Sequence, residues 1–137
     1  MQTTLTRTVR FRAEHHYHRA DWSSERNREA FGDTAVPHTH LFEVAVSVSG
    51  PVDPETGFLV DLGALDALLE REVRAPLAEQ SLNEAVPSFR HGRLQPSTEA
   101  LAQVLWERLD GSIPLPARLE RVVVRESDSL ESEVRRP

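Results

Sequence analysis

The sequence contains no cysteine and no lysine. Without cysteine the chain cannot form a disulfide, a thiolate metal site or a thiol nucleophile. Without lysine it cannot form a Schiff base with a carbonyl substrate. All sixteen basic residues are arginine, which we attribute to codons rich in G and C. The missing thiol matters most for the interpretation of function below.

Long apolar runs and clusters of basic residues are also missing. No apolar run is long enough to span a bilayer or to resemble a signal sequence, so we expect a cytoplasmic location and no membrane partner. A net charge of −6 without a basic stripe argues against nucleic-acid binding. With 137 residues and 39% hydrophobic content, residues 1–137 are expected to form one globular domain.

The hydrophobic patterns predict an α+β fold. Alternation of apolar and polar residues indicates strands, and apolar stripes at helical spacing indicate amphipathic helices. A short helix capped by Ser23 or Ser24 is predicted to end at Gly32. Pro76 is expected to end the long helix that begins at about residue 61. Residues 77–96 are predicted to form an irregular loop. The main elements follow the order β-β-α-α-β-β: strands at about 4–15 and 38–48, helices at about 61–75 and 97–109, and strands at about 119–125 and 130–135.

Two helices with apolar stripes need a sheet to cover, so we expect both on one face of a four-stranded antiparallel sheet. Such a sheet has two free edges. Proteins often cover free edges by pairing with copies of themselves, and an oligomer that closes a barrel of strands is one such arrangement.

Three histidines are predicted to meet at one end of this sheet. Side chains alternate along a strand, so His38 and His40 point to the same face as the apolar residues that follow them. His15 ends the first strand on its apolar face. If the two strands pair antiparallel, His15 lies next to His38 and His40, giving three nitrogen ligands and an open fourth position, as in a catalytic zinc site. Isolated strand histidines are more often packed or hydrogen-bonded, but the third histidine at the matching strand end favours a metal site.

Several short motifs extend along nearly the whole chain. In order they are Phe11-x-Ala13-x-His15, Phe31-Gly32 before the paired histidines, Gly57-Phe58-Leu59-Val60-Asp61-Leu62, Leu82-Asn83, Pro96-Ser97-Thr98-Glu99-Ala100-Leu101-Ala102, and Val124-Arg125-Glu126-Ser127. In this order and spacing the sequence resembles the 6-pyruvoyltetrahydropterin synthase and 6-carboxytetrahydropterin synthase family. The segment from Trp22 to Gly32 looks most like the 6-pyruvoyl branch.

The resemblance implies a fold, a cofactor and an activity. It implies the tunnelling fold, a homohexamer of stacked trimers, and Zn²⁺ held by His15, His38 and His40. It also implies a pterin pocket in which the Glu126 carboxylate anchors the amino-pyrimidinone ring, a task suited to a bidentate acceptor. In the family, zinc polarises the substrate side chain, a cysteine and an Asp-His pair handle protons, and triphosphate leaves dihydroneopterin triphosphate.

The proton-handling positions differ from the family pattern. Thr34 stands where the family has its cysteine, and its hydroxyl is far too weak an acid to supply a resting anion at neutral pH. Ala78 and Glu79 stand where the family has aspartate and histidine. Losing a general base typically costs about 10²–10⁴-fold in rate.

Three functions are compatible with this pattern. In the first, the protein is a zinc-dependent pterin lyase or aldolase-like enzyme in which Glu79, or Asp33 beside Thr34, serves as the base. Alternatively, it is a zinc enzyme redirected to another small heterocyclic or carbonyl substrate. In the third case it binds a pterin or purine-like ligand without catalysis, or serves as an assembly partner.

Overall fold

The computed structural model describes all residues from Met1 to Pro137. Its strands are β1 (Thr3–His15), β2 (His38–Gly50), β3 (Gln80–Ser81), β4 (Arg118–Ser127) and β5 (Leu130–Arg135). Its α-helices are α1 (Ser24–Phe31), α2 (Leu62–Leu69), α3 (Ala75–Leu77), α4 (Leu82–Ala85) and α5 (Thr98–Leu109). Two 3-10 turns, Gly32–Ala35 and Pro87–Phe89, and one π-helical turn, Glu70–Arg74, complete the fold.

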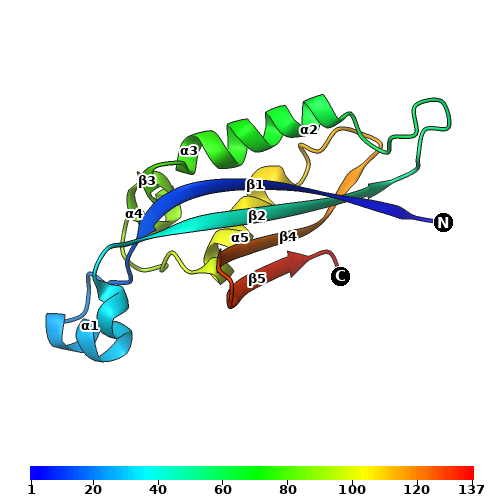
Figure 1. Cartoon of the computed structure of the whole chain (residues 1–137). Helices are drawn as coiled ribbons and strands as arrows, with labels where there is room; N and C mark the ends of the chain where they lie inside the picture. The colour runs from blue at the N-terminus through cyan, green and yellow to red at the C-terminus, as the bar shows by residue number, and fades with distance from the viewer.

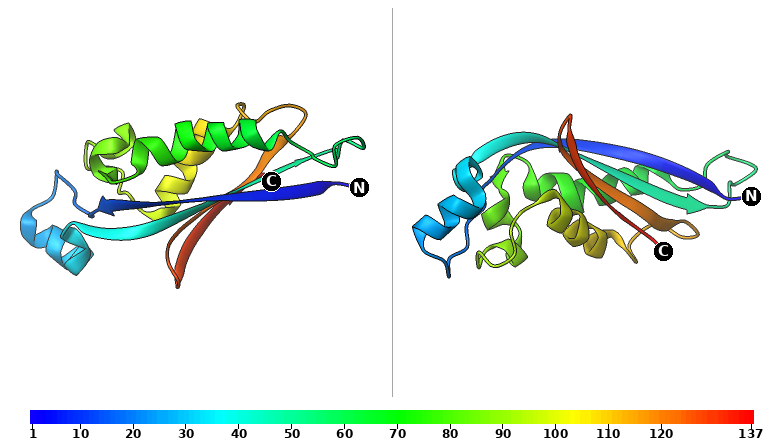
Figure 2. Two further views of the ribbon diagram at one scale, coloured as in Figure 1. Left: turned by 45° about the horizontal axis from the view of Figure 1, so that its top comes forward. Right: turned by 90° about the horizontal axis from the view of Figure 1, so that it is seen from below.

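The sheet and the helices form two layers. Figure 1 shows the long strands β1 and β2 side by side, with β4 and β5 following on one side. Figure 2 shows α2 and α5 on one face of the sheet, whereas the other face is left open. Helix α1 projects beyond the end of the sheet. None of the helices combines the length and the apolar character that a membrane crossing requires.

The four expected strands pair antiparallel, but the sheet has a fifth strand. The strand order is β3-β1-β2-β4-β5, and the two residues of β3 pair parallel with Ala13 and Glu14 of β1. The prediction of an irregular loop at 77–96 was therefore too simple, because this segment also contains α4 and a 3-10 turn. Elements of two to four residues leave no periodic pattern in a sequence.

The first long helix passes through Pro76 instead of ending before it. α2, the π turn Glu70–Arg74 and α3 follow one another without a break, and Leu77 is the last helical residue. In the π turn a backbone N–H donates to the carbonyl five residues earlier instead of four, as the Ala75 N–H does to the Glu70 carbonyl. Pro76 thus lies at the start of a new helical turn, where its missing N–H is not needed.

Side-chain alternation places the core between the two layers. Phe42, Val44, Val46 and Val48 of β2 are almost fully buried, as are the leucines of α2 and α5 that face them. Asp61 caps α2 by accepting from the Ala64 N–H. The continuous apolar packing fixes the β1–β2 register, because a slip by one residue would turn every core side chain to the opposite face.

Candidate functional site

The β1–β2 register brings the three histidines together. His15 lies directly opposite His38, and His40 lies opposite Ala13 one step further along the same face. The ring centroids are 4.6 Å apart for His15 and His38, 5.2 Å for His15 and His40, and 5.1 Å for His38 and His40. One nitrogen from each ring lies within 4.8 Å of the other two. The predicted juxtaposition of the three imidazoles is confirmed.

Backbone carbonyls determine which nitrogen is free in two of the rings. Nδ1 of His15 is 2.7 Å from the Pro96 carbonyl, and Nδ1 of His38 is 2.8 Å from the Val36 carbonyl. A carbonyl oxygen only accepts, so each Nδ1 carries the hydrogen and each Nε2 keeps its lone pair. An orienting hydrogen bond of this kind is typical of histidines that ligate a metal through the other nitrogen.

Two of the three Nε2 atoms are buried without protein partners. Nε2 of His15 and Nε2 of His40 are both inaccessible to solvent and make no hydrogen bond. Burial of His15, with smaller effects from His38 and His40, lowers the pKa of its imidazole to about 4. His15 is therefore neutral at pH 7, which is the form that binds a metal.

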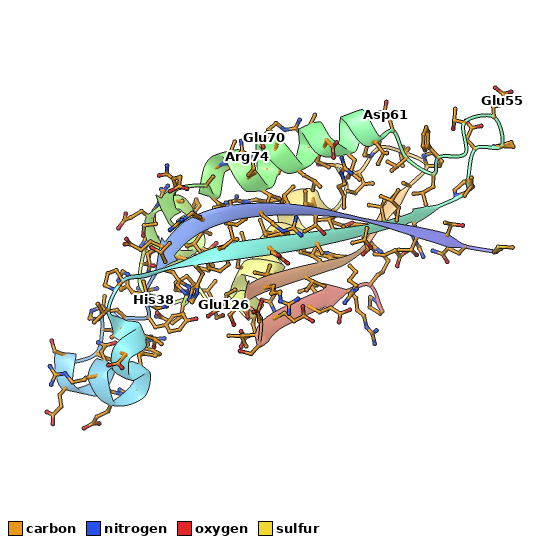
Figure 3. All side chains as sticks on the ribbon, viewed as in Figure 1. His38, Glu55, Asp61, Glu70, Arg74 and Glu126 are labelled. Carbon is orange, nitrogen blue, oxygen red and sulfur yellow. The ribbon has the colours of Figure 1, made fainter.

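Glu126 lies beside the histidines at a β-bulge. In the β4–β5 pair, Arg125 faces Glu131 and Ser127 faces Leu130, so Glu126 is the extra residue between them. Bulges re-aim side chains and are frequent next to active sites. Figure 3 shows Glu126 and His38 at the same end of the sheet, far from Glu55 at the opposite tip.

The carboxylate of Glu126 has one oxygen without a partner. Oε2 is 3.3 Å from Nε2 of His40, whereas Oε1 is buried and makes no hydrogen bond. The contact to His40 lacks hydrogen-bond geometry, because Nε2 also remains without a partner. A side chain that is 11% exposed with an unsatisfied oxygen is costly to bury, and a ligand with N–H donors would remove that cost.

Tyr17 borders the same site, although the sequence patterns did not single it out as a site residue. Burial, followed by the charges of Glu126 and Glu99, raises the pKa of the Tyr17 phenol to about 12. Glu99 accepts from the hydroxyls of Thr98 and Ser132, and these bonds help to lower the pKa of its carboxyl group. Tyr17 comes two residues after His15, and its place in a connection between strands was the only available signal.

Thr34 and Asp33 lie in the 3-10 turn before β2 and are exposed. The Thr34 hydroxyl donates to the Phe31 carbonyl at 2.5 Å, so its proton is committed to the backbone. Asp33 lines a cavity of about 380 Å³ together with His18 and Arg28. The catalytic roles of Asp33 and Thr34 stay predictions.

Glu79 belongs to the other face of the sheet. It is exposed, its φ of 60° is in the left-handed region, and its N–H donates to the Arg12 carbonyl at the β1 edge. It shares a cavity of about 180 Å³ with Arg12, Glu14 and Thr39, whose positions alternate away from the histidines. Within one chain, Glu79 is therefore not grouped with His15, His38 and His40, and its role as a base also stays a prediction.

Together these residues provide three imidazole nitrogens and one buried carboxylate at a single strand end. Three neutral imidazoles suit a zinc ion with an open coordination position. The unpartnered Nε2 atoms fit such an ion, because each would otherwise be a buried polar atom without a hydrogen-bond partner. The carboxylate beside them fits a ligand that offers N–H groups.

Comparison with known proteins identifies the family. The family model described as 6-pyruvoyl tetrahydropterin synthase matches residues 4–137. The human 6-pyruvoyl tetrahydrobiopterin synthase is 32% identical over 130 residues, covering 93% of this chain and 88% of the human protein.

Solved structures show the same fold. The Caenorhabditis elegans 6-pyruvoyl tetrahydropterin synthase superposes with a TM-score of 0.89 at 24% identity, over 100% of this chain and 97% of that one. A Plasmodium vivax 6-pyruvoyltetrahydropterin synthase, in which a catalytic glutamate is replaced by cysteine, gives a TM-score of 0.62 at 17% identity, over 99% and 98% of the chains. With the family match over nearly its entire length, the chain belongs to the 6-pyruvoyl tetrahydropterin synthase family.

Proposed function

We propose that the protein is a zinc-dependent lyase that acts on a dihydropterin such as dihydroneopterin triphosphate. The observation that carries this proposal is the cluster of unpartnered buried atoms at one strand end, Nε2 of His15, Nε2 of His40 and Oε1 of Glu126. Buried polar atoms in folded proteins are usually hydrogen-bonded, so two imidazole nitrogens and a carboxylate oxygen without partners in one place support a ligand-binding role.

The roles divide between the histidines and Glu126. His15, His38 and His40 would hold the zinc ion, which supplies Lewis-acid polarisation of a substrate oxygen when bound. Glu126 would accept from the ring N–H and amino group of the pterin and so orient the ring. The Nδ1 hydrogen bonds of His15 and His38 keep both rings fixed before the ligand binds.

The base is proposed to be a carboxylate. Thr34 cannot act from a resting anion, because an alkyl hydroxyl is not ionised at neutral pH. A glutamate serves as a catalytic residue in the Plasmodium vivax relative, which supports carboxylate chemistry in this family. Asp33, which adjoins Thr34, and Glu79 are the two candidates.

Glu79 can act only in the site of a neighbouring copy, since it lies on the face opposite its own histidines. A homohexamer would provide such a neighbour. The outer edge of β1 is paired only at Ala13 and Glu14, and β5 has no strand on its outer side. Pairing of these two edges between subunits would cover both and bring Glu79 to another chain.

The test is incubation of the zinc-loaded protein with dihydroneopterin triphosphate, with measurement of triphosphate release and of the pterin product. Turnover should disappear when zinc is removed and return when it is restored. Glu126→Gln should keep its zinc and lose about 10–100-fold in pterin affinity, because hydrogen bonds to a charged group are among the strong ones. Release of triphosphate that does not depend on zinc would refute the proposal.

Two variants identify the base. If Glu79 is the base, Glu79→Gln should lower turnover by about 10²–10⁴-fold with little change in pterin affinity. If Asp33 is the base, Asp33→Asn should do so instead. Unchanged turnover in both variants would exclude both carboxylates.

Non-catalytic binding is the second candidate, favoured by Thr34 and Ala78 at positions where the family carries proton-handling groups. A thermal-shift screen with pterins separates the two functions, because a ligand that binds the folded state raises its melting temperature. A clear shift with a pterin and no turnover of any dihydropterin would assign the protein as a binder.

A further inference from the structure

Tyr17 lies beside the histidine cluster. It is the only tyrosine in the chain and lies two residues after His15, where β1 ends. Its ring centroid lies 5.2 Å from that of His15 at an interplanar angle of 66°, and 6.4 Å from that of His38 at 80°. The Phe31 ring is 5.9 Å away. The phenol ring therefore contacts His15 on one side and α1 on the other.

Backbone hydrogen bonds fix the position of this ring. The Tyr17 N–H donates to the Thr34 carbonyl at 2.9 Å, so Tyr17 is tied to the turn that carries Asp33 and Thr34. The Asn83 side chain pairs with both backbone groups of His16, at 3.1 and 3.0 Å. Tyr17 thus lies in a fastened segment, and its side chain is placed before a ligand arrives.

Gln95 fastens the other neighbour of Tyr17. Its side chain accepts from the His18 N–H at 2.8 Å and donates to the His18 carbonyl at 3.2 Å. Both residues that flank Tyr17 are therefore held through their N–H and their carbonyl.

The Tyr17 hydroxyl is a free donor in this setting. No hydrogen bond of the chain involves it, although the side chain is half-buried. The Tyr17 ring adjoins His15, the His15 ring lies 5.2 Å from that of His40, and Nε2 of His40 is 3.3 Å from Oε2 of Glu126. The Tyr17 hydroxyl is a donor without a partner in the chain, whereas Oε1 of Glu126 is an acceptor without one. A ligand that satisfies both must carry N–H donors at one end and an oxygen acceptor at the other.

We propose that Tyr17 is a ligand-binding residue that donates its hydroxyl hydrogen to an oxygen on the side chain of a pterin. The proposal rests on the proposed function and assigns to Tyr17 the selection of pterins with a hydroxyl or carbonyl group on that side chain. Glu126 binds the pterin ring, and Tyr17 binds the oxygen of its side chain. A site that hydrogen-bonds a substrate oxygen discriminates against analogues that lack it, because its own polar group is then left unpaired.

The experiment compares two ligands and one variant. Neopterin carries a hydroxylated side chain, and 6-methylpterin has the same ring without a side-chain oxygen. Binding of each to the zinc-loaded wild type and to zinc-loaded Tyr17→Phe is measured by calorimetry. The variant should bind neopterin about fivefold more weakly, the size expected for one neutral hydrogen bond, and 6-methylpterin with nearly unchanged affinity.

Zinc content and thermal midpoint of Tyr17→Phe are the structural controls, and both should equal those of the wild type. Equal loss of affinity for both pterins, or loss of zinc, would show that Tyr17 acts through packing on His15 and would overturn the proposal. Unchanged affinity for neopterin would overturn it while leaving the proposed function intact. If neither pterin binds the wild type, the proposed function and this inference both fail.

Discussion

The two ends of the sheet differ in what they leave unsatisfied. At the His38 end, four buried side-chain atoms lack hydrogen-bond partners: Nε2 of His15, Nδ1 of His16, Nε2 of His40 and Oε1 of Glu126. At the opposite end, a cavity of about 760 Å³ is lined by residues such as Phe58 and Leu115, and several of these apolar side chains are exposed. The comparison teaches that buried groups without partners and a large cavity point to different ends of the sheet, and the candidate functional site lies at the end with the unpartnered groups.

The reason is energetic. An exposed apolar side chain is common on protein surfaces and costs little, whereas a buried acceptor without a donor costs on the order of 1–3 kcal/mol. A protein retains several such atoms in one place only if binding satisfies them. The predictions below test this contrast, beginning with the largest expected effect.

Replacement of His38 by alanine should remove the metal. His38 contributes one of three candidate ligands, and losing a ligand should weaken zinc binding more than the roughly 10–100-fold that follows loss of an orienting partner. The measurement is the zinc content of the purified variant after dialysis against a weak chelator. His91→Ala is the matched control, because His91 is exposed and lies outside the cluster. Full zinc content in His38→Ala would refute the metal site.

Acidification should destabilise the zinc-free protein through His15. The pKa of His15 is about 4 in the fold and about 6.5 when unfolded, so the unfolded chain binds more protons between these values. Stability is therefore full above pH 6.5 and falls as the pH decreases towards 4. Between pH 7 and 5 the loss should be about 2 kcal/mol.

Urea unfolding at several pH values between 5 and 7 measures this loss. Some carboxyl groups, among them Asp66 and Glu70, also have a lowered pKa in the fold. Their protonation reduces stability only when the pH falls to about their unfolded pKa values of 3.8 and 4.5. Burial also lowers the pKa of His16, so His15→Gln should reduce the dependence in this window to the part that His16 contributes, whereas His91→Gln should leave it unchanged. If the full slope survived in His15→Gln, the effect would have to come from another group.

Replacement of Leu115 by serine should have the smallest effect. Leu115 lines the apolar cavity and is 91% exposed, so the free energy of unfolding should change by less than about 0.5 kcal/mol. Zinc content and pterin affinity should equal those of the wild type. A lower zinc content in Leu115→Ser would mean that the two ends of the sheet are coupled and would remove the contrast between them.

Alternation along the strands was sufficient to predict the cluster of three histidines. The spacing of His38 and His40 places both on the core face, and the apolar residues of β1 place His15 on the same face. Once the strands pair antiparallel, no other contact is needed to bring the three rings together. Glu126 was identified from its motif, but only the structure showed that a bulge aims it at His40.

The alternation of side chains did not predict the hydrogen-bond partners that orient the residues of the site. Asn83 was part of a motif, yet its bonds to His16 join residues 67 positions apart in sequence. The Pro96 carbonyl that orients His15 lies 81 positions away. Such contacts depend on how loops pack, and a loop has no periodicity from which its direction can be read.

The sequence by itself determined the order of the main strands and helices, the face of each strand that enters the core, and the three imidazoles that this face carries. Those features follow from local periodicity and from one strand pairing, which burial of the apolar face enforces. Only the tertiary structure decided that Tyr17 borders the imidazoles, that Glu126 leaves an oxygen free, and that Glu79 lies on the opposite face. These positions are set by a bulge, a left-handed residue and side-chain bonds across long connections, which no repeating pattern records.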